Sequence, residues 1–206
     1  KPTLVNNVET LVNVLSIVKD GGAAYAALGT DGSKGRKLFC LSGAVAKPGI
    51  YEVEFGITLR QLIDLGGGMR SGSTMQAILL GGAAGGFVGP NDLDLPLTME
   101  ATRAAGSSLG SGVVMVLDQS VDMVDQLRRI AAFFRDESCG QCVPCRVGTV
   151  RQEEIVSRLA KGVQSHDIEL LRELGTVMRD ASICGLGQTA NSAIDSAINK
   201  LKVFAV

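Results

Sequence analysis

The sequence predicts an α+β protein in which a small mixed sheet is followed by a bundle of four helices. Short apolar or alternating segments, bounded by glycine and proline turns, occur between residues 37 and 117. From residue 121 onward, apolar residues instead recur at helical spacing. We therefore expect an N-terminal helix and linker over residues 1–35, a sheet domain over 36–118 and a helical domain over 119–206.

The N-terminal unit begins K-P-T-L-V-N-N-V-E-T and continues with apolar residues at helical spacing over 8–18. Asn6 or Asn7 supplies the N-cap, and the glycine pair at 21–22 ends the helix. Two side-chain amides, free backbone N–H groups and Thr10 converge at this helix N-terminus. The arrangement fits a phosphate or other anion site, and a simple capped amphipathic helix explains the same residues.

The sheet unit opens with a predicted hairpin, in which a K-P-G turn joins strands over 37–42 and 50–55. Thr58 then caps a short helix, L-R-Q-L-I-D-L, which three glycines end. Two further strands are predicted over 75–80 and 112–117. Together these elements predict a mixed sheet with one helix packed on it.

A glycine-rich segment, G-G-A-A-G-G-F-V-G-P, follows the strand over 75–80 and resembles a nucleotide-binding loop at first sight. It lacks the Lys-Ser/Thr pair of a P-loop and leads to P-N-D rather than into a helix. No helix dipole would therefore face a phosphate. We favour a structural turn here, and another at L-G-S-G over 109–112.

The helical unit contains predicted helices over 121–135, 148–160, 167–178 and 188–203. The first leads into E-S-C-G-Q-C-V-P-C-R-V-G, where three cysteines have strict two-residue spacing, and a fourth follows in S-I-C-G-L-G. One tight loop can hold three corners of a [4Fe–4S] cluster while a distant cysteine supplies the fourth. The four candidate ligands are Cys139, Cys142, Cys145 and Cys184.

Neighbouring residues fit an anionic cluster at this position. Free N–H groups at the start of the next helix can donate to cluster sulfurs. Arg146 and Arg151 can offset the negative charge, and ordinary solvated helix charges are an equal alternative for both.

Other readings of the cysteines remain open. Structural zinc sites usually pair two C-x-x-C knuckles or mix cysteine with histidine. The single histidine, His166, lies outside both cysteine segments, and we expect it at a helix start on the surface. Disulfides suit small secreted chains, and no signal peptide is visible. Cys40, in the apolar run K-L-F-C-L-S, is expected to be a small buried hydrophobic residue.

Bulk properties argue against two classes of partner. The net charge of −1 gives no basic footprint for nucleic acid, and the absence of Trp argues against a stacking platform for bases. The longest uncharged stretch, 71–90, is rich in glycine and has no apolar helical face, so we expect no direct membrane insertion.

Three motifs resemble one family. The cysteine segment with the downstream S-I-C-G-L-G-Q-T-A, the opening K-P-T-L-V-N-N-V-E-T, and L-G-S-G-V-V-M-V-L-D are similar to the family of NADH-binding flavoprotein subunits of respiratory complex I. That family includes the diaphorase subunit of NAD-reducing hydrogenases and the beta subunit of soluble NAD-dependent formate dehydrogenases. The resemblance covers essentially the whole chain, and the cysteine motif is its most specific part.

The resemblance implies a soluble-ligand-binding β-grasp (SLBB) domain, followed by a four-helix bundle that carries the [4Fe–4S] cluster. It implies that the four cysteines of the two motifs are the cluster ligands. It also implies that the phosphate of FMN is contacted at the N-terminal helix by Asn6, Asn7 and Thr10.

The implied function is single-electron transfer between FMN and other iron–sulfur centres in an NADH:acceptor or NAD⁺-reducing oxidoreductase. The family's main FMN and NADH domain contains a G-R-G-G-A-G-F-type loop, which does not occur here. We therefore expect that NAD(H) binds to the complete subunit and that this chain alone does not turn over NADH.

Expected partners are a thioredoxin-like [2Fe–2S] subunit and a larger iron–sulfur subunit, in a cytoplasmic complex or one peripheral to a membrane complex. Two alternatives stay open. In the first, the β-grasp unit binds a ligand or a partner protein and the cluster has only a structural role. In the second, the chain is an interaction protein whose fold is held together by a structural zinc ion.

Overall fold

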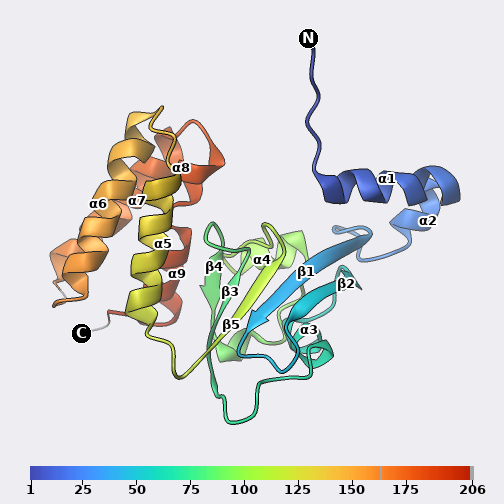
Figure 1. The fold of residues 1–206 in the computed structure, drawn as a ribbon, viewed down its shortest axis with the longest axis horizontal. Helices are drawn as coiled ribbons and strands as arrows, with labels where there is room; N and C mark the ends of the chain where they lie inside the picture. Colours follow the sequence, from blue (N-terminus) through green and yellow to red (C-terminus); the bar gives the residue numbers. More distant parts are fainter. Residues whose placement is uncertain (163, 205–206) are drawn as a thin grey trace.

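The computed structural model describes residues 1–162 and 164–204 and contains a five-stranded mixed sheet flanked by two helical regions (Figure 1). The strand order is β2-β1-β5-β3-β4, with β1 and β5 parallel and the other neighbours antiparallel. The strands are β1 (Arg36–Gly43), β2 (Gly49–Glu54), β3 (Met75–Leu80), β4 (Gly86–Val88) and β5 (Val113–Asp118).

The predicted hairpin and its following helix are confirmed. Strands β1 and β2 pair antiparallel, from Arg36 opposite Glu54 to Leu41 opposite Gly49. Thr58 caps α3 (Leu59–Leu65) through a capping box in which its hydroxyl accepts from the Gln61 N–H. Strand β4, the short helix α4 (Met99–Ala104) and the 3-10 turn η1 (Pro90–Asp92) are additions that the pattern did not predict.

The two faces of the sheet are buried in two separate cores. On one face, Phe39 and Leu41 of β1 pack with Leu59 and Leu62 of α3. On the other face, residues of β3, β4 and β5 pack against the C-terminal helices. This second core joins the sheet to the helical region.

The helical region consists of α5 (Met123–Glu137), α6 (Val143–Leu159), α7 (Ser165–Ala181), α8 (Gly185–Thr189) and α9 (Ser192–Lys200). The single helix predicted over 188–203 is therefore two helices. The chain turns at Asn191, whose carbonyl accepts from the Asp195 N–H to begin α9 and whose side chain occupies the space beside Gly175. Helix α6 begins at Val143 rather than Gly148, which places Cys145 inside its first turn.

The expectation that Cys40 is buried is wrong, because its side chain is exposed. Residues Cys40 and Val113 are register partners, so Cys40 faces the same side as Met115 and Leu117 of β5. The C-terminal helices cover that side over β5, β3 and β4, as Met115 and Leu117 pack into their core. They leave β1 uncovered there, and Leu38 is also exposed.

A polar cluster lies at the end of β5. The buried carboxylate of Asp118 accepts from the hydroxyls of Ser120 at 2.6 Å and Ser73 at 2.7 Å, and it pairs with Arg70 at 3.3 Å. The Ser120 hydroxyl, followed by that of Ser73, lowers the pKa of Asp118 to about 2. Asp118 is therefore ionised at neutral pH and fixes the segment that leads into α5.

The N-terminal helix α1 (Val8–Asp20) is capped by Asn7 and followed by the short α2 (Gly22–Ala26). Its apolar side chains are exposed except that of Ile17, which is partly buried, so the helix is held to the sheet mainly by polar contacts. In the described part of the chain, no helix combines the length and apolar character that crossing a membrane requires.

Candidate metal centre and N-terminal helix

The four predicted ligands come from two segments at one end of the helical region. Figure 1 shows that the end of α5, the start of α6 and the short α8 meet at the end away from the entry into α5. Cys139, Cys142 and Cys145 lie between α5 and the first turn of α6, and Cys184 precedes α8. Cys142 and Cys184 are the N-cap residues of α6 and α8, so the positive ends of both helix dipoles lie at the cysteines.

Gly187 lets the two segments approach one another. A methyl group at Gly187 would lie 2.9 Å from Cβ of Cys145 and closer still to the hydroxyl of Ser182. No side chain larger than hydrogen fits between α8 and the first turn of α6. The glycine thus brings the segment that carries Cys184 against the cysteine loop.

The surroundings of Cys142 favour its thiolate. Its pKa is lowered mainly by the backbone N–H of Ile183 and then by that of Cys145. The first donor comes from the segment that carries Cys184, whereas the second comes from α6. Metal ligation requires the thiolate form, so both segments prepare this residue to bind iron or another soft metal.

The donor set fits a [4Fe–4S] cluster. All the cysteines are free thiols, which sets the disulfide alternative aside for this structure. Across residues 1–162 and 164–204, no group of three or more Cys, His, Asp or Glu side chains could hold a single metal ion. In a cubane cluster each thiolate binds a different iron, so the four sulfurs lie farther apart than around one ion. Four soft sulfur donors beside two helix N-termini suit that arrangement.

Of the two arginines singled out in the sequence, Arg146 lies on the cysteine loop. Its Nη1 donates to the carbonyl oxygen of Gly140 at 2.8 Å, and Gly140 has a positive φ of 73° that closes the loop. Arg151 pairs with Glu154 on the exposed face of α6. His166 is exposed in the first turn of α7, as expected.

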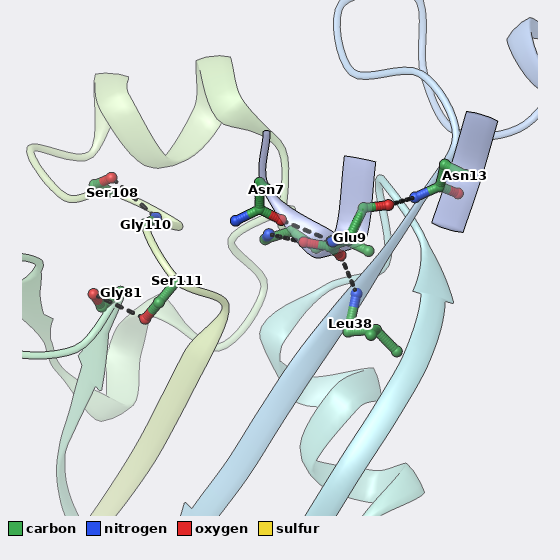
Figure 2. Close-up of polar contacts among 9 residues, drawn as sticks. Asn7, Glu9, Asn13, Leu38, Gly81, Ser108, Gly110 and Ser111 are labelled. Atoms are coloured by element: carbon green, nitrogen blue, oxygen red, sulfur yellow. Dashed lines mark hydrogen bonds and ion pairs between the residues drawn. The ribbon is translucent and has the colours of Figure 1, made fainter. Parts of the chain in front are cut away.

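The second candidate site is the N-terminus of α1 (Figure 2). Oδ1 of Asn7 accepts from the Glu9 N–H at 2.8 Å, and Asn6 and Thr10 are exposed. The carboxylate of Glu9 reaches β1, where it accepts from Lys37 Nζ at 3.2 Å and from the Leu38 N–H at 2.9 Å. The first-turn acid is thus paired with a cation, which lowers its repulsion of an anion at the helix N-terminus.

Residues 81–85 and the L-G-S-G segment form packed turns, as predicted, whereas residues 86–88 of the glycine-rich segment form β4. The Ser111 hydroxyl donates to the Gly81 carbonyl at 3.4 Å, and the Gly110 N–H donates to the Ser108 hydroxyl at 3.1 Å (Figure 2). A methyl group at Gly110 would lie 2.8 Å from the Gly81 carbonyl oxygen. Glycine is needed here for the close approach of two backbones, which accounts for the motif without a nucleotide.

Sequence reasoning missed two polar neighbours of the cysteines. Oγ of Ser138 lies 3.3 Å from Sγ of Cys145, and Ser182 lies beside Cys142. Ser138 directly precedes Cys139, and Ser182 lies two residues before Cys184, so their place in the cysteine motifs is the signal that could have pointed to them.

Comparison with known proteins assigns two regions of the chain. Residues 125–203 match the NADH-ubiquinone oxidoreductase-F iron–sulfur binding region, and residues 38–88 match the SLBB domain. The chain is 40% identical over 201 residues to the HndC subunit of the NADP-reducing hydrogenase of Solidesulfovibrio fructosivorans, covering 97% of this chain and 41% of HndC. It is 39% identical over 202 residues to the F subunit of the NADH-quinone oxidoreductase of Mycobacterium tuberculosis, covering 98% and 45%.

A solved structure agrees with these relatives. The chain superimposes on a chain in the crystal structure of the NAD⁺-reducing [NiFe]-hydrogenase in the H₂-reduced state with a TM-score of 0.87 and 39% identity. The match covers 98% of this chain and 34% of that one. The chain spans less than half the length of the curated relatives described above.

The chain therefore contains an SLBB domain followed by an NADH-ubiquinone oxidoreductase-F iron–sulfur binding region. More particularly, the chain is homologous to the F subunits of NADH-quinone oxidoreductases and to the hydrogenase protein HndC.

Proposed function

We propose that this chain is the electron-transfer portion of an NADH:acceptor or NAD⁺-reducing oxidoreductase subunit, passing single electrons between FMN and other iron–sulfur centres. A [4Fe–4S] cluster, when bound, takes up and releases one electron at a time. The proposed ligands are Cys139, Cys142, Cys145 and Cys184. The observation that carries the proposal is the meeting of two cysteine segments at two helix N-termini, in the region matched to an iron–sulfur binding family.

The residues around these cysteines hold and screen the site. Cys145 is buried, and its carbonyl accepts from the Thr149 hydroxyl inside α6 at 2.9 Å. Arg146 closes the loop across Gly140 and brings a positive charge to the anionic centre. No general acid or base is required of this chain, because the step is an electron transfer.

The remaining parts of the proposal concern the complete subunit. We propose a boundary between the sheet and helical domains near residue 118, with a β-grasp sheet domain over 36–118 and a four-helix bundle within 119–206. Residues 1–35 would be the edge of an FMN and NADH domain, with the FMN phosphate bound by Asn6, Asn7 and Thr10. The partners would be a thioredoxin-like [2Fe–2S] subunit and a larger iron–sulfur subunit, in the cytoplasm or peripheral to a membrane complex.

The test is to compare this chain with the complete subunit under anaerobic conditions. Dithionite should give the reduced-cluster EPR signal in both, whereas NADH should give it only in the complete subunit, because hydride must first pass to FMN. A cluster that stays oxidised while the flavin of the complete subunit is reduced would refute electron transfer through this chain. Reduction of the isolated chain by NADH would refute the proposal that residues 1–35 form only the edge of the FMN and NADH domain.

A further inference from the structure

Two serine hydroxyls lie against two of the proposed cluster ligands, each at the end of a different helix. We infer that Ser138 and Ser182 donate hydrogen bonds to the sulfurs of Cys145 and Cys142, and that these two bonds raise the reduction potential of the cluster. The inference rests on the proposed function, and it assigns these two residues as tuning residues for the electron-transfer step. Neither serine is itself a proposed ligand.

The hydroxyl of Ser138 lies within hydrogen-bond distance of a ligand sulfur. Ser138 is the C-cap residue of α5, and its Oγ lies 3.3 Å from Sγ of Cys145. The same Oγ accepts from the Gly140 N–H, also at 3.3 Å. A thiolate can only accept a hydrogen bond, so in the cluster-bound state the hydroxyl of Ser138 is the donor of this pair while it also accepts from Gly140.

Ser182 occupies the equivalent position on the other side of the site. It is the C-cap residue of α7 and only 7% exposed. In the described part of the chain, its buried Oγ has no hydrogen-bond partner. A buried hydroxyl is costly to leave unpaired. This hydroxyl faces the cysteines, because a methyl group at Gly187 would collide with it and would lie 2.9 Å from Cβ of Cys145. The thiol of Cys142 lies beside it.

Donors to sulfur favour the more negative state of a cluster. Reduction adds one negative charge, and hydrogen bonds to the ligand sulfurs stabilise that charge more strongly in the reduced state. Low local polarity increases the effect, and Cys145 and Ser182 are both buried. Removing either hydroxyl should therefore make the cluster harder to reduce, without removing any ligand.

The experiment is an EPR-monitored redox titration of the cluster in Ser138→Ala, Ser182→Ala and the double variant, with iron and sulfide counted in each. Ser157→Ala, on α6 beyond the cysteine loop, is the matched control. We expect wild-type cluster content and, for each single variant, about a tenfold lower ratio of reduced to oxidised cluster at a given potential, about 59 mV for a one-electron couple. The double variant should shift further, and the control should not shift.

Unchanged potentials in variants with full cluster content would overturn the inference. If an alanine variant loses the cluster, Ser138→Thr is measured instead, because threonine keeps a hydroxyl at that position. The inference requires a reduction potential near that of the wild type in this variant. A potential as low as that expected for loss of the hydroxyl contradicts the inference. Absence of a cluster from the wild-type protein would instead refute the proposed function itself, so the two failures are distinguishable.

Discussion

Replacing Cys184 with serine is expected to reduce cluster iron from about four atoms per chain to nearly none while the sheet domain stays folded. Cys184 is the proposed ligand that comes from a separate segment, at the N-terminus of α8. A serine hydroxyl is a poor substitute for the soft thiolate that iron–sulfur clusters select. The measurement is iron and acid-labile sulfide per chain, with the reduced-state EPR signal.

The control for this variant is Cys40→Ser. Cys40 is a free, exposed thiol on β1, in the sheet domain. Its replacement removes one cysteine from the chain without touching the helical region, so cluster content should be unchanged. Hydrogen exchange should show the core around Phe39 and Leu59 protected in both variants. Unchanged iron and an unchanged EPR signal in Cys184→Ser would contradict the ligand assignment.

The second large effect is expected from Gly187→Ala. The added methyl group would lie 2.9 Å from Cβ of Cys145 and would collide with Ser182. Overpacking of this kind costs about 1–3 kcal/mol. Because relief requires α8 to move away from α6, we expect a lower unfolding temperature of the helical region and loss of most of the cluster.

A matched control lies two residues away in the same short helix. At Gly185 a methyl group would meet no heavy atom within 4 Å, so Gly185→Ala should be tolerated. Both substitutions exchange glycine for a better helix former by about 1 kcal/mol, which removes helix propensity as an explanation for any difference. Equal cluster content and equal stability in the two variants would show that the close packing at Gly187 has no role in assembling the site.

Local signals made much of the fold predictable. The K-P-G turn and its alternating flanks predicted the β1–β2 hairpin, and Thr58 with three following glycines predicted α3. Strand β4 was missed because it has three residues inside a glycine-rich segment and depends on pairing with β3. The break between α8 and α9 was missed because apolar spacing continues across Asn191.

The candidate site, like the fold, could be predicted only in part from the sequence. The spacing of the cysteines is local information, so the candidate ligands could be named from the sequence, and they stay a prediction. Whether Cys40 is covered depends on where the C-terminal helices dock on the sheet, which no pattern in its own strand encodes. The contacts of Ser182 and Gly187 with the cysteines likewise arise only when α7 and α8 turn back onto α6.

The most direct test of the central claim is the metal and sulfide content of the anaerobically purified chain, with an EPR spectrum after reduction. The proposed electron-transfer role predicts about four iron and four acid-labile sulfide per chain, with the signal of a reduced cluster. About one zinc per chain without sulfide would contradict it, because zinc has no redox chemistry and the site would then only staple the helices.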